Sequence, residues 1–203
     1  MKRILILLSM ACASLTFSAQ TQSVATNKQV VATNYLAGAV TTNNGFVEFK
    51  EIIAASGKSK AELFNAIKTF TQKEIIESEN HLPNTRITEM NPEEGVIAAS
   101  VVETLWFKRK AWTSDFAEMH YQLVFIVEDG RVEATMRNIK YGYEPMKIHG
   151  QDNLLRAEEW ITDKEALSKD GKKLTKVAGK KFRTKTIDRK NQIFEAVAKA
   201  CAQ

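Results

Sequence analysis

The chain has 203 residues, a formal net charge of +5 and 44% hydrophobic residues, which is ordinary for one globular domain with appendages. Its two cysteines exclude a disulfide framework, because Cys12 lies in a segment that we expect to be removed. The positive charge is unevenly placed, since residues 171–190 hold nine Lys or Arg and one Asp. The rest of the mature chain is therefore acidic on balance.

The first residues have the pattern of a secretory signal peptide. A basic pair at residues 2–3 precedes an apolar run from Ile4, and a short polar segment follows at 18–20. This apolar run is too short for a permanent membrane anchor, so we expect cleavage after Ala19 and a mature chain without a transmembrane helix. The alternative is lipidation at Cys12, which lacks the usual Leu three residues upstream. Both routes predict an exported protein of the periplasm or cell envelope.

A leader and one strand–helix unit come next. Residues 20–45 are rich in Thr, Asn and Ala, and we expect a mobile leader with one strand around Val30–Leu36. The alternation of apolar residues in Phe46–Ala54 predicts a first strand of the domain. Ser59, with Glu62 three residues later, forms a capping box, and apolar residues at helical spacing predict a helix that runs to about Glu77.

Consecutive strands follow the helix. Turn residues separate four apolar segments, at Arg86–Met90, Val96–Phe107, Met119–Glu128 and 131–143, and residues 108–118 are expected to be a loop. Such a run of hairpins predicts an antiparallel sheet with helices gathered on one face. The fold class is therefore α+β, with the order β-α-β-β-β-β.

The last hairpin has a defined register. Asp129 and Gly130 between alternating apolar runs predict a tight two-residue turn, in which both loop residues have positive φ. Glu128 then faces Arg131, and every second residue beyond this pair points to the core.

This alternation breaks at Arg137 and Asn138. One extra residue there would return Ile139, Tyr141 and Tyr143 to the core side, so the sequence predicts a β-bulge. The alternative is that Arg137 and Asn138 are aimed at a ligand.

The strand at Val96–Phe107 is apolar on both of its faces, which is unexpected in a sheet with one face in water. Something should therefore cover the second face. The candidates are the leader, the region after Pro145 or a partner, and we favour the chain itself.

Two helices are expected in the C-terminal region. Thr162 and Glu165 form a second capping box for a short helix that Gly171 should end, and Asp188 should cap a last helix that runs through Ala200. Cys201 continues the apolar stripe of this helix, so we expect a buried small hydrophobe rather than a nucleophile.

The sequence contains no motif for catalysis, metal binding or cofactor binding. His81, His120 and His149 lie far apart and have no acidic or thiol neighbours at the spacing of metal ligands. We therefore name no catalytic, metal or cofactor-binding residue, and the interpretation is that the protein is not an enzyme.

Two basic segments are candidates for contacts with an anionic partner. The first contains Lys172, Lys173, Lys180, Lys181 and Arg183, although a solvated connector would look the same. The second is the segment after the strand at Val96–Phe107, which joins cations to an aromatic residue through Lys108, Arg109, Lys110 and Trp112.

Four stretches carry a resemblance to a known family: GKSKAELFNAIKTF, VEDGRVEATMRNIKY, EEWITDKEAL and KFRTKTIDRKNQIFEAV. With the order of elements above, they make the chain similar to the bacterial family called domain of unknown function 4468. The resemblance covers Phe46–Tyr143 well and the tail less distinctly. It implies an exported Gram-negative protein with a fold like that of the TATA-box-binding protein (TBP), a curved antiparallel sheet backed by helices. It supplies no catalytic or binding residue, and nucleic-acid binding by the fold's namesake is analogy only.

These observations predict four parts: a signal peptide at 1–19, a flexible leader at 20–45, an α+β TBP-like domain at 46–145 and a basic, helical C-terminal extension at 146–203. The leading functional hypothesis is a non-enzymatic binding module of the cell envelope, with an envelope protein or an anionic surface as partner and no nucleic acid. The alternative is a carrier of a small apolar ligand in the concave sheet.

Overall fold

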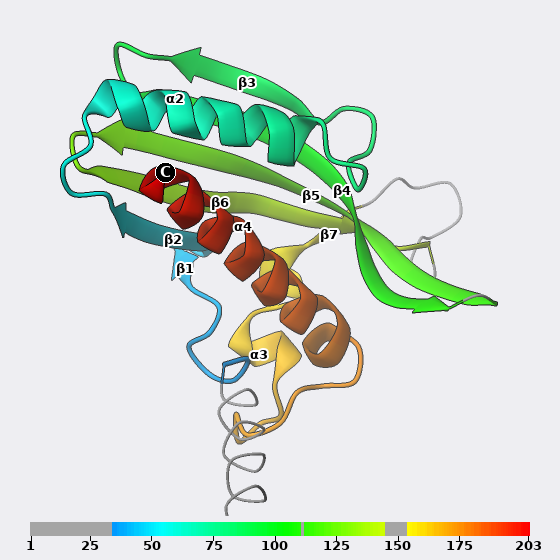
Figure 1. Ribbon diagram of the computed structural model, residues 1–203. Coiled ribbons are helices and arrows are strands. Elements are labelled where there is room, and N and C mark those ends of the chain that lie inside the picture. The colour runs from blue at the N-terminus through cyan, green and yellow to red at the C-terminus, as the bar shows by residue number, and fades with distance from the viewer. Residues whose placement is uncertain (1–33, 111, 145–153) are drawn as a thin grey trace, which may run out of the picture. The chain divides into compact units, whose positions relative to one another are not determined.

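The computed structural model describes residues 34–110, 112–144 and 154–203 (Figure 1). The signal-peptide prediction, Cys12 and His149 lie outside these residues. The described part contains an antiparallel sheet in the order β1-β2-β6-β5-β4-β3, with β7 beside β6. The strands are β1 (Thr42–Asn43), β2 (Phe46–Ala54), β3 (Arg86–Asn91), β4 (Val96–Lys110), β5 (Thr113–Glu128), β6 (Arg131–Gly142) and β7 (Leu155–Arg156).

The predicted α+β class is confirmed, and the first strand has the predicted bounds. The helices are α2 (Lys60–Phe70) with its π-helical continuation η1 (Thr71–Ile76), the short η3 (Ala157–Glu159) and α3 (Asp163–Ala166), and η4 (Ala178–Arg183) followed by α4 (Thr184–Ala202). The capping box is also present, since Ser59 N donates to Glu62 Oε2 at 2.8 Å and Ser59 Oγ accepts from Glu62 N.

Both long helices, α2 and α4, lie on the same face of the sheet (Figure 1). Their apolar stripes meet the inward-facing residues of β2, β4, β5 and β6 in one core. Cys201 is buried at the end of the α4 stripe, as predicted. The C-terminal region is thus built into the domain core, because α4 supplies Ile193, Phe194 and Val197 to it.

Several predictions for the C-terminal region are wrong. The Thr162 hydroxyl does not cap α3 but donates to Glu158 O at 3.2 Å, and α3 ends at Ala166, before Gly171. Asp188 lies inside α4, because the π-helical turn η4 leads directly into the helix at Thr184.

The end of the leader is packed rather than mobile. Val40 is buried in the core, and Tyr35 OH donates to Asp188 Oδ1 at 2.5 Å. This hydrogen bond, with burial, raises the pKa of Tyr35 to about 12. Of the strand predicted at Val30–Leu36, only residues 34–36 are described, and they form a turn.

The β5–β6 hairpin has the predicted register, with Glu128 opposite Arg131 and Val127 opposite Val132. Of the two turn residues, only Gly130 has positive φ, so the expectation for Asp129 is wrong. The Asp129 carboxylate instead accepts from Lys60 N at 2.7 Å and ties the turn to the start of α2.

The predicted β-bulge is confirmed. The β5–β6 pairing jumps from Gln122 opposite Arg137 to His120 opposite Lys140, and Asn138 adopts a positive φ of 55°. Asn tolerates this left-handed conformation better than most residues. The residues that follow on the inward side, including Ile139 and Tyr141, are buried.

The β4–β5 hairpin is longer than predicted. Residues 108–118 do not form a loop, since β4 continues to Lys110 and β5 begins at Thr113. Trp106 and Phe116 face each other across the two strands with ring centroids 5.1 Å apart, and such aromatic pairs stabilise antiparallel ladders.

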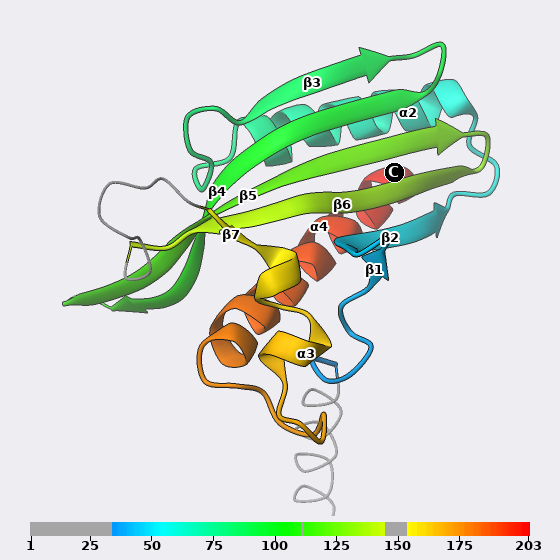
Figure 2. The same ribbon diagram turned by 180° about the vertical axis from the view of Figure 1, so that it is seen from behind.

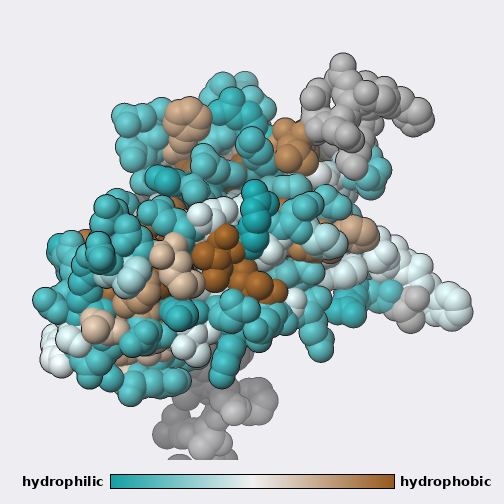
Figure 3. Space-filling view, turned by 90° about the horizontal axis from the view of Figure 1, so that it is seen from above, coloured by the Kyte–Doolittle hydropathy of each residue, from teal (hydrophilic) through white to brown (hydrophobic). Residues whose placement is uncertain are grey.

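The edge strand β3 is protected by polar side chains. Viewed from above, the surface is mostly hydrophilic, and hydrophobic residues show in several separate small areas (Figure 3). Arg86 and Glu89 are exposed on this edge. Charges on an edge strand oppose edge-to-edge association.

Two glycines with the same backbone conformation allow a test of the turn before β4. Gly95 and Gly130 have φ of +76° and +74°, but a Cβ at Gly95 would lie 2.3 Å from Val127 O, whereas a Cβ at Gly130 meets nothing within 4 Å. We expect Gly130→Ala to cost about 1 kcal/mol of unfolding free energy from backbone strain alone, and Gly95→Ala to cost roughly 2–5 kcal/mol because overpacking is added. Urea denaturation measures both; equal losses would contradict the described turn.

Candidate functional site

The sheet has an open face, which we define as the face opposite α2 and α4. In Figure 2, strands β3 to β6 lie in front of both helices. The prediction that the region after residue 145 covers this face is wrong for its described part, because α4 packs on the other face. Apolar side chains on the open face are consequently exposed: Ile52 by 59%, Phe116 by 41% and Ile126 by 38%.

The open face is apolar at both ends and polar in between. At one end, Ile52 and Ile126 flank Glu133 in neighbouring strands. At the other end lie Trp106 and Phe116. A mixed surface of this kind fits a macromolecular partner better than a single apolar molecule.

Arg137 and Asn138, the residues of the predicted bulge, lie in the polar middle of the open face. Arg137 Nε donates to Gln122 Oε1 at 2.9 Å, and Asn138 Nδ2 donates to the same oxygen at 3.4 Å. Both side chains are exposed. The bulge therefore places Arg137 and Asn138 beside Gln122 on the open face. It also returns the next inward-facing residues of β6 to the core.

The second candidate segment forms the hairpin tip, which we define as Lys108, Arg109, Lys110 and Trp112. All four side chains are exposed, and Trp112 is 97% exposed. The Arg109 guanidinium lies over the Trp106 ring, 5.1 Å from its centroid. The structure thus brings the predicted loop residues together at the end of a two-stranded ribbon.

The base of this ribbon is fixed by aromatic packing. The buried Phe182 of η4 contacts Phe107, Tyr141, Tyr143 and Trp160, with ring centroids 4.8–5.3 Å apart. These contacts join β4, β6, η3 and η4 below the hairpin tip. The sequence offered no signal for this cluster, because its members come from distant segments.

The basic segment does not form one patch. Lys172, Lys173 and Lys180 are exposed, but Lys181 Nζ donates to Asp115 Oδ2 at 2.5 Å and to Tyr143 OH at 3.1 Å. The hydrogen bond from Lys181 holds the pKa of Asp115 below its usual value. Lys181 is therefore a structural tie between η4 and the ribbon.

Arg183 must be removed from the set of candidate contacts, because its side chain is fully buried. It donates to three backbone carbonyls, of Tyr35, Leu36 and Ile161, and forms an ion pair with Asp163 at 2.7 Å. A planar guanidinium with five donors suits such a set of acceptors. Arg183 thus ties the end of the leader to α3 and α4.

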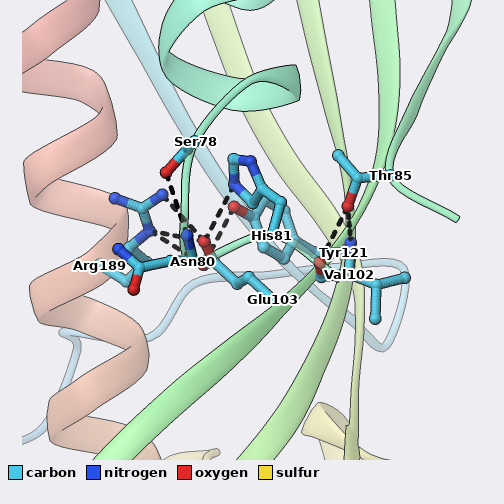
Figure 4. Close-up of polar contacts among 8 residues, drawn as sticks. All are labelled: Ser78, Asn80, His81, Thr85, Val102, Glu103, Tyr121 and Arg189. Atoms are coloured by element: carbon cyan, nitrogen blue, oxygen red, sulfur yellow. Dashed lines mark hydrogen bonds and ion pairs between the residues drawn. The ribbon is translucent and has the colours of Figure 1, made fainter. Parts of the chain in front are cut away.

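Sequence reasoning missed a buried polar cluster between α4 and the sheet (Figure 4). Glu103 on β4 accepts from both Nε and Nη2 of Arg189, each at 2.9 Å, and from Tyr121 OH at 3.1 Å. His81 Nε2 lies 3.4 Å from the same carboxylate. Sequence reasoning missed Glu103 because it lies in an otherwise apolar strand. Its position on the inward face of β4 was the one signal that it is buried and needs a partner.

The environment fixes the charge of this cluster. Burial alone would raise the pKa of Glu103, but His81 and Arg189 outweigh it and hold the pKa below 4.5. The pKa of the buried Tyr121 is raised by desolvation and by the Glu103 charge. Glu103 is therefore ionised at neutral pH, and with Arg189 it forms a charged contact between β4 and α4.

The described residues contain no group of three or more side chains suited to hold a metal ion. His81 is beside Glu103, and His120 lies 3.6 Å from Glu118 on another part of the sheet. No described helix is long and apolar enough to cross a membrane.

A groove of about 740 Å³ runs between α2 and α4. Its lining includes Leu63, Phe70, Ala196 and the buried Cys201, with Lys58 and Lys199 among its polar residues. Its volume falls within the range of small-ligand pockets.

Fold and surfaces together define an α+β protein in which helices cover one face of an open antiparallel sheet. Residues 49–142 match the family described as "Domain of unknown function (DUF4468) with TBP-like fold". This match of residues 49–142 to the family's model confirms the resemblance seen in the sequence.

Two solved structures are similar to the chain. A DUF4468 family protein from Bacteroides ovatus ATCC 8483 has 29% identity and a TM-score of 0.75, covering 84% of this chain and 95% of its own. A TBP-like protein from Parabacteroides distasonis ATCC 8503 has 21% identity and a TM-score of 0.62, covering 80% and 96%. No curated protein matches the sequence. Each of these matches covers more of the chain than residues 49–142.

The Glu103–Arg189 pair gives a prediction with a matched control. Glu103→Gln leaves the partly exposed Arg189 guanidinium without its carboxylate and should cost roughly 2–3 kcal/mol of unfolding free energy. Glu128→Gln breaks an exposed pair with Arg131 and should cost at most about 1 kcal/mol. Chemical denaturation measures both, and similar losses would contradict the role given to the buried pair.

Acid should weaken the contact between Glu103 and Arg189. Because the folded-state pKa of Glu103 is lowered, its contribution is complete above its unfolded pKa and is lost as the pH falls through the folded pKa. The wild type should therefore lose stability below pH 4.5 more steeply than Glu103→Gln. Parallel pH profiles of the two proteins would contradict this.

Proposed function

We propose that the protein is an exported, non-enzymatic interaction module of the cell envelope, and that it binds a macromolecular partner through the open face. The signal-like N-terminal sequence supports export. The exposed Ile52, Ile126 and Phe116 of the sheet support binding, because their burial by a partner would be favourable.

The single observation that carries the proposal is the placement of both long helices on one face of the sheet. On the open face Ala98 and Val102 of β4 are already buried within the domain, whereas Ile126 on the neighbouring strand β5 is 38% exposed. Burial of this surface by a partner would contribute favourable free energy. The charged residues between the two apolar ends would then set the orientation of the partner.

The exposed lysines of the basic segment support a second, weaker contact with an anionic surface. Lys172 and Lys173 lie in the turn after α3, and Lys180 lies on η4. Exposed cations attract anionic surfaces over about 8 Å at physiological salt. We do not propose nucleic acid as a partner, because an exported protein would not meet it.

The apolar groove between α2 and α4 favours a second candidate function, a carrier of a small apolar ligand. The ligand would then occupy this groove rather than the sheet, whose open face is crossed by Arg137 and Gln122. The lining residues Leu63, Phe70 and Ala196 would contact its apolar part.

The open face should be required for association with the envelope. Replacement of both Ile52 and Ile126 by Ser removes two exposed side chains whose burial by a partner would stabilise the complex, and should lower retention by envelope fractions of the exporting cell roughly ten-fold or more. Met90→Ser is the control, because Met90 is also exposed but lies on the helix side of the edge strand β3. Retention that is unchanged in the double variant would contradict the proposal.

Native mass spectrometry distinguishes the carrier from the interaction module. A carrier purified from its own host should show a co-purified small-molecule mass that is lost when Ala196, in the groove, is replaced by Trp. The interaction module should show the mass of the chain alone. A bound small molecule that is insensitive to the groove variant would contradict the assignment of the ligand to this groove.

A further inference from the structure

The hairpin tip combines features that the open face lacks. Three cations, Lys108, Arg109 and Lys110, stand beside Trp112, whose side chain is almost completely in water. A fully exposed Trp leaves a large apolar ring in water without any contribution to the core. The exposure of Trp112 is therefore explained by contact with a binding partner rather than by folding.

We propose that the hairpin tip inserts into the headgroup region of a lipid bilayer that carries anionic lipid. This inference rests on the proposed envelope location and names one contact surface of the module. Trp has a polar N–H and an apolar ring, and it is enriched at the membrane interface. Neighbouring Lys and Arg side chains are attracted to anionic headgroups.

The charge of the tip supports an anionic surface. Asp115 is the single acidic residue between Lys108 and Phe116, and its carboxylate accepts hydrogen bonds from Lys181 and Tyr143 at the base of the ribbon. The cations of the tip thus retain a net positive charge. An anionic surface complements this charge, whereas a neutral one does not.

The shape of the tip favours a surface over a small ligand. The pairing of β5 with β6 ends at Glu118 opposite Gly142, while β4 and β5 remain paired as far as Lys110 and Thr113. The ribbon therefore extends beyond the sheet, as Figures 1 and 2 show. Small ligands bind in concave sites, whereas a projecting tip can approach a flat bilayer.

The base of the ribbon holds the tip in place. Phe107 packs on Phe182 at 4.8 Å and on Tyr143 at 5.7 Å, and Lys181 joins η4 to Asp115. Arg109 is positioned by its contact with the Trp106 ring. A tip that is ordered before binding loses little conformational entropy when it binds.

Vesicle co-sedimentation tests the proposal with the chain that lacks residues 1–19, because the apolar run from Ile4 would itself partition into lipid. The compact unit Tyr35–Gln203 does not include that segment. The wild type should bind phosphatidylcholine vesicles that contain about 30% phosphatidylglycerol, bind pure phosphatidylcholine weakly, and lose binding at high salt. Trp fluorescence should shift to the blue on binding.

Variants locate the contact. Trp112→Ala should weaken binding about ten-fold, the effect of losing one buried aromatic side chain. Replacement of Lys108, Arg109 and Lys110 by Gln should weaken it at least about 30-fold, since each cation near an anionic surface contributes roughly five-fold. The matched control replaces Lys68, Lys73 and Lys199 by Gln, which removes the same charge from exposed positions of α2, η1 and α4 outside the tip and the basic segment, and should leave binding within about two-fold.

Three results would overturn the proposal: no binding to anionic vesicles, binding that depends on the control lysines rather than the tip, or binding to soluble acidic polysaccharide without binding to vesicles. Circular dichroism of each variant checks that the fold is retained. The assay contains no protein partner, so its failure would leave retention through Ile52 and Ile126 unaffected. Retention that is unchanged in the Ile52 and Ile126 double variant, together with intact vesicle binding, would instead reject the open face alone.

Discussion

The buried contact between Arg189 and Glu103 determines much of this architecture. It fixes α4 on the same face of the sheet as α2, and the carboxylate is shielded from water on the inward side of β4. A buried charge requires a partner in a defined position, so α4 has little freedom to move to the other face. The open face follows from this constraint, because both long helices of the described residues pack on the other face.

Two further contacts fix the surroundings of α4. Phe182 anchors the base of the β4–β5 ribbon in an aromatic cluster, and Arg183 beside it binds carbonyls at the end of the leader and in the segment before α3. One short π-helical turn thus connects the leader, the ribbon and the last helix. The cations of the basic segment therefore have two different roles. Those that are buried or paired stabilise the fold, and the exposed lysines can contact an anionic surface.

The predictions from sequence are correct where residues close together along the chain determine the local structure. The Ser59 capping box, the register set by Gly130 and the bulge at Asn138 all depend on short-range geometry, and all three are present. The predictions are wrong where contacts with residues distant in the sequence determine the structure. Arg183 and Lys181 read as solvated cations because their acceptors come from the leader, α3 and β5. Residues 108–118 read as a loop because they are polar, but the Trp106–Phe116 pair supports a ribbon there.

The central claim is that the open face lies uncovered in the isolated, folded chain. Cysteine labelling tests this directly, because Cys201 is buried and burial raises the pKa of its thiol, which makes it an internal reference that reacts slowly. With Cys12 replaced by Ala, a cysteine introduced by Ile126→Cys should react with a maleimide at nearly the rate of an unfolded peptide, while Cys201 reacts only when the chain unfolds. Protection of the Ile126→Cys thiol to the level of Cys201 would show that the face is covered and would contradict the account.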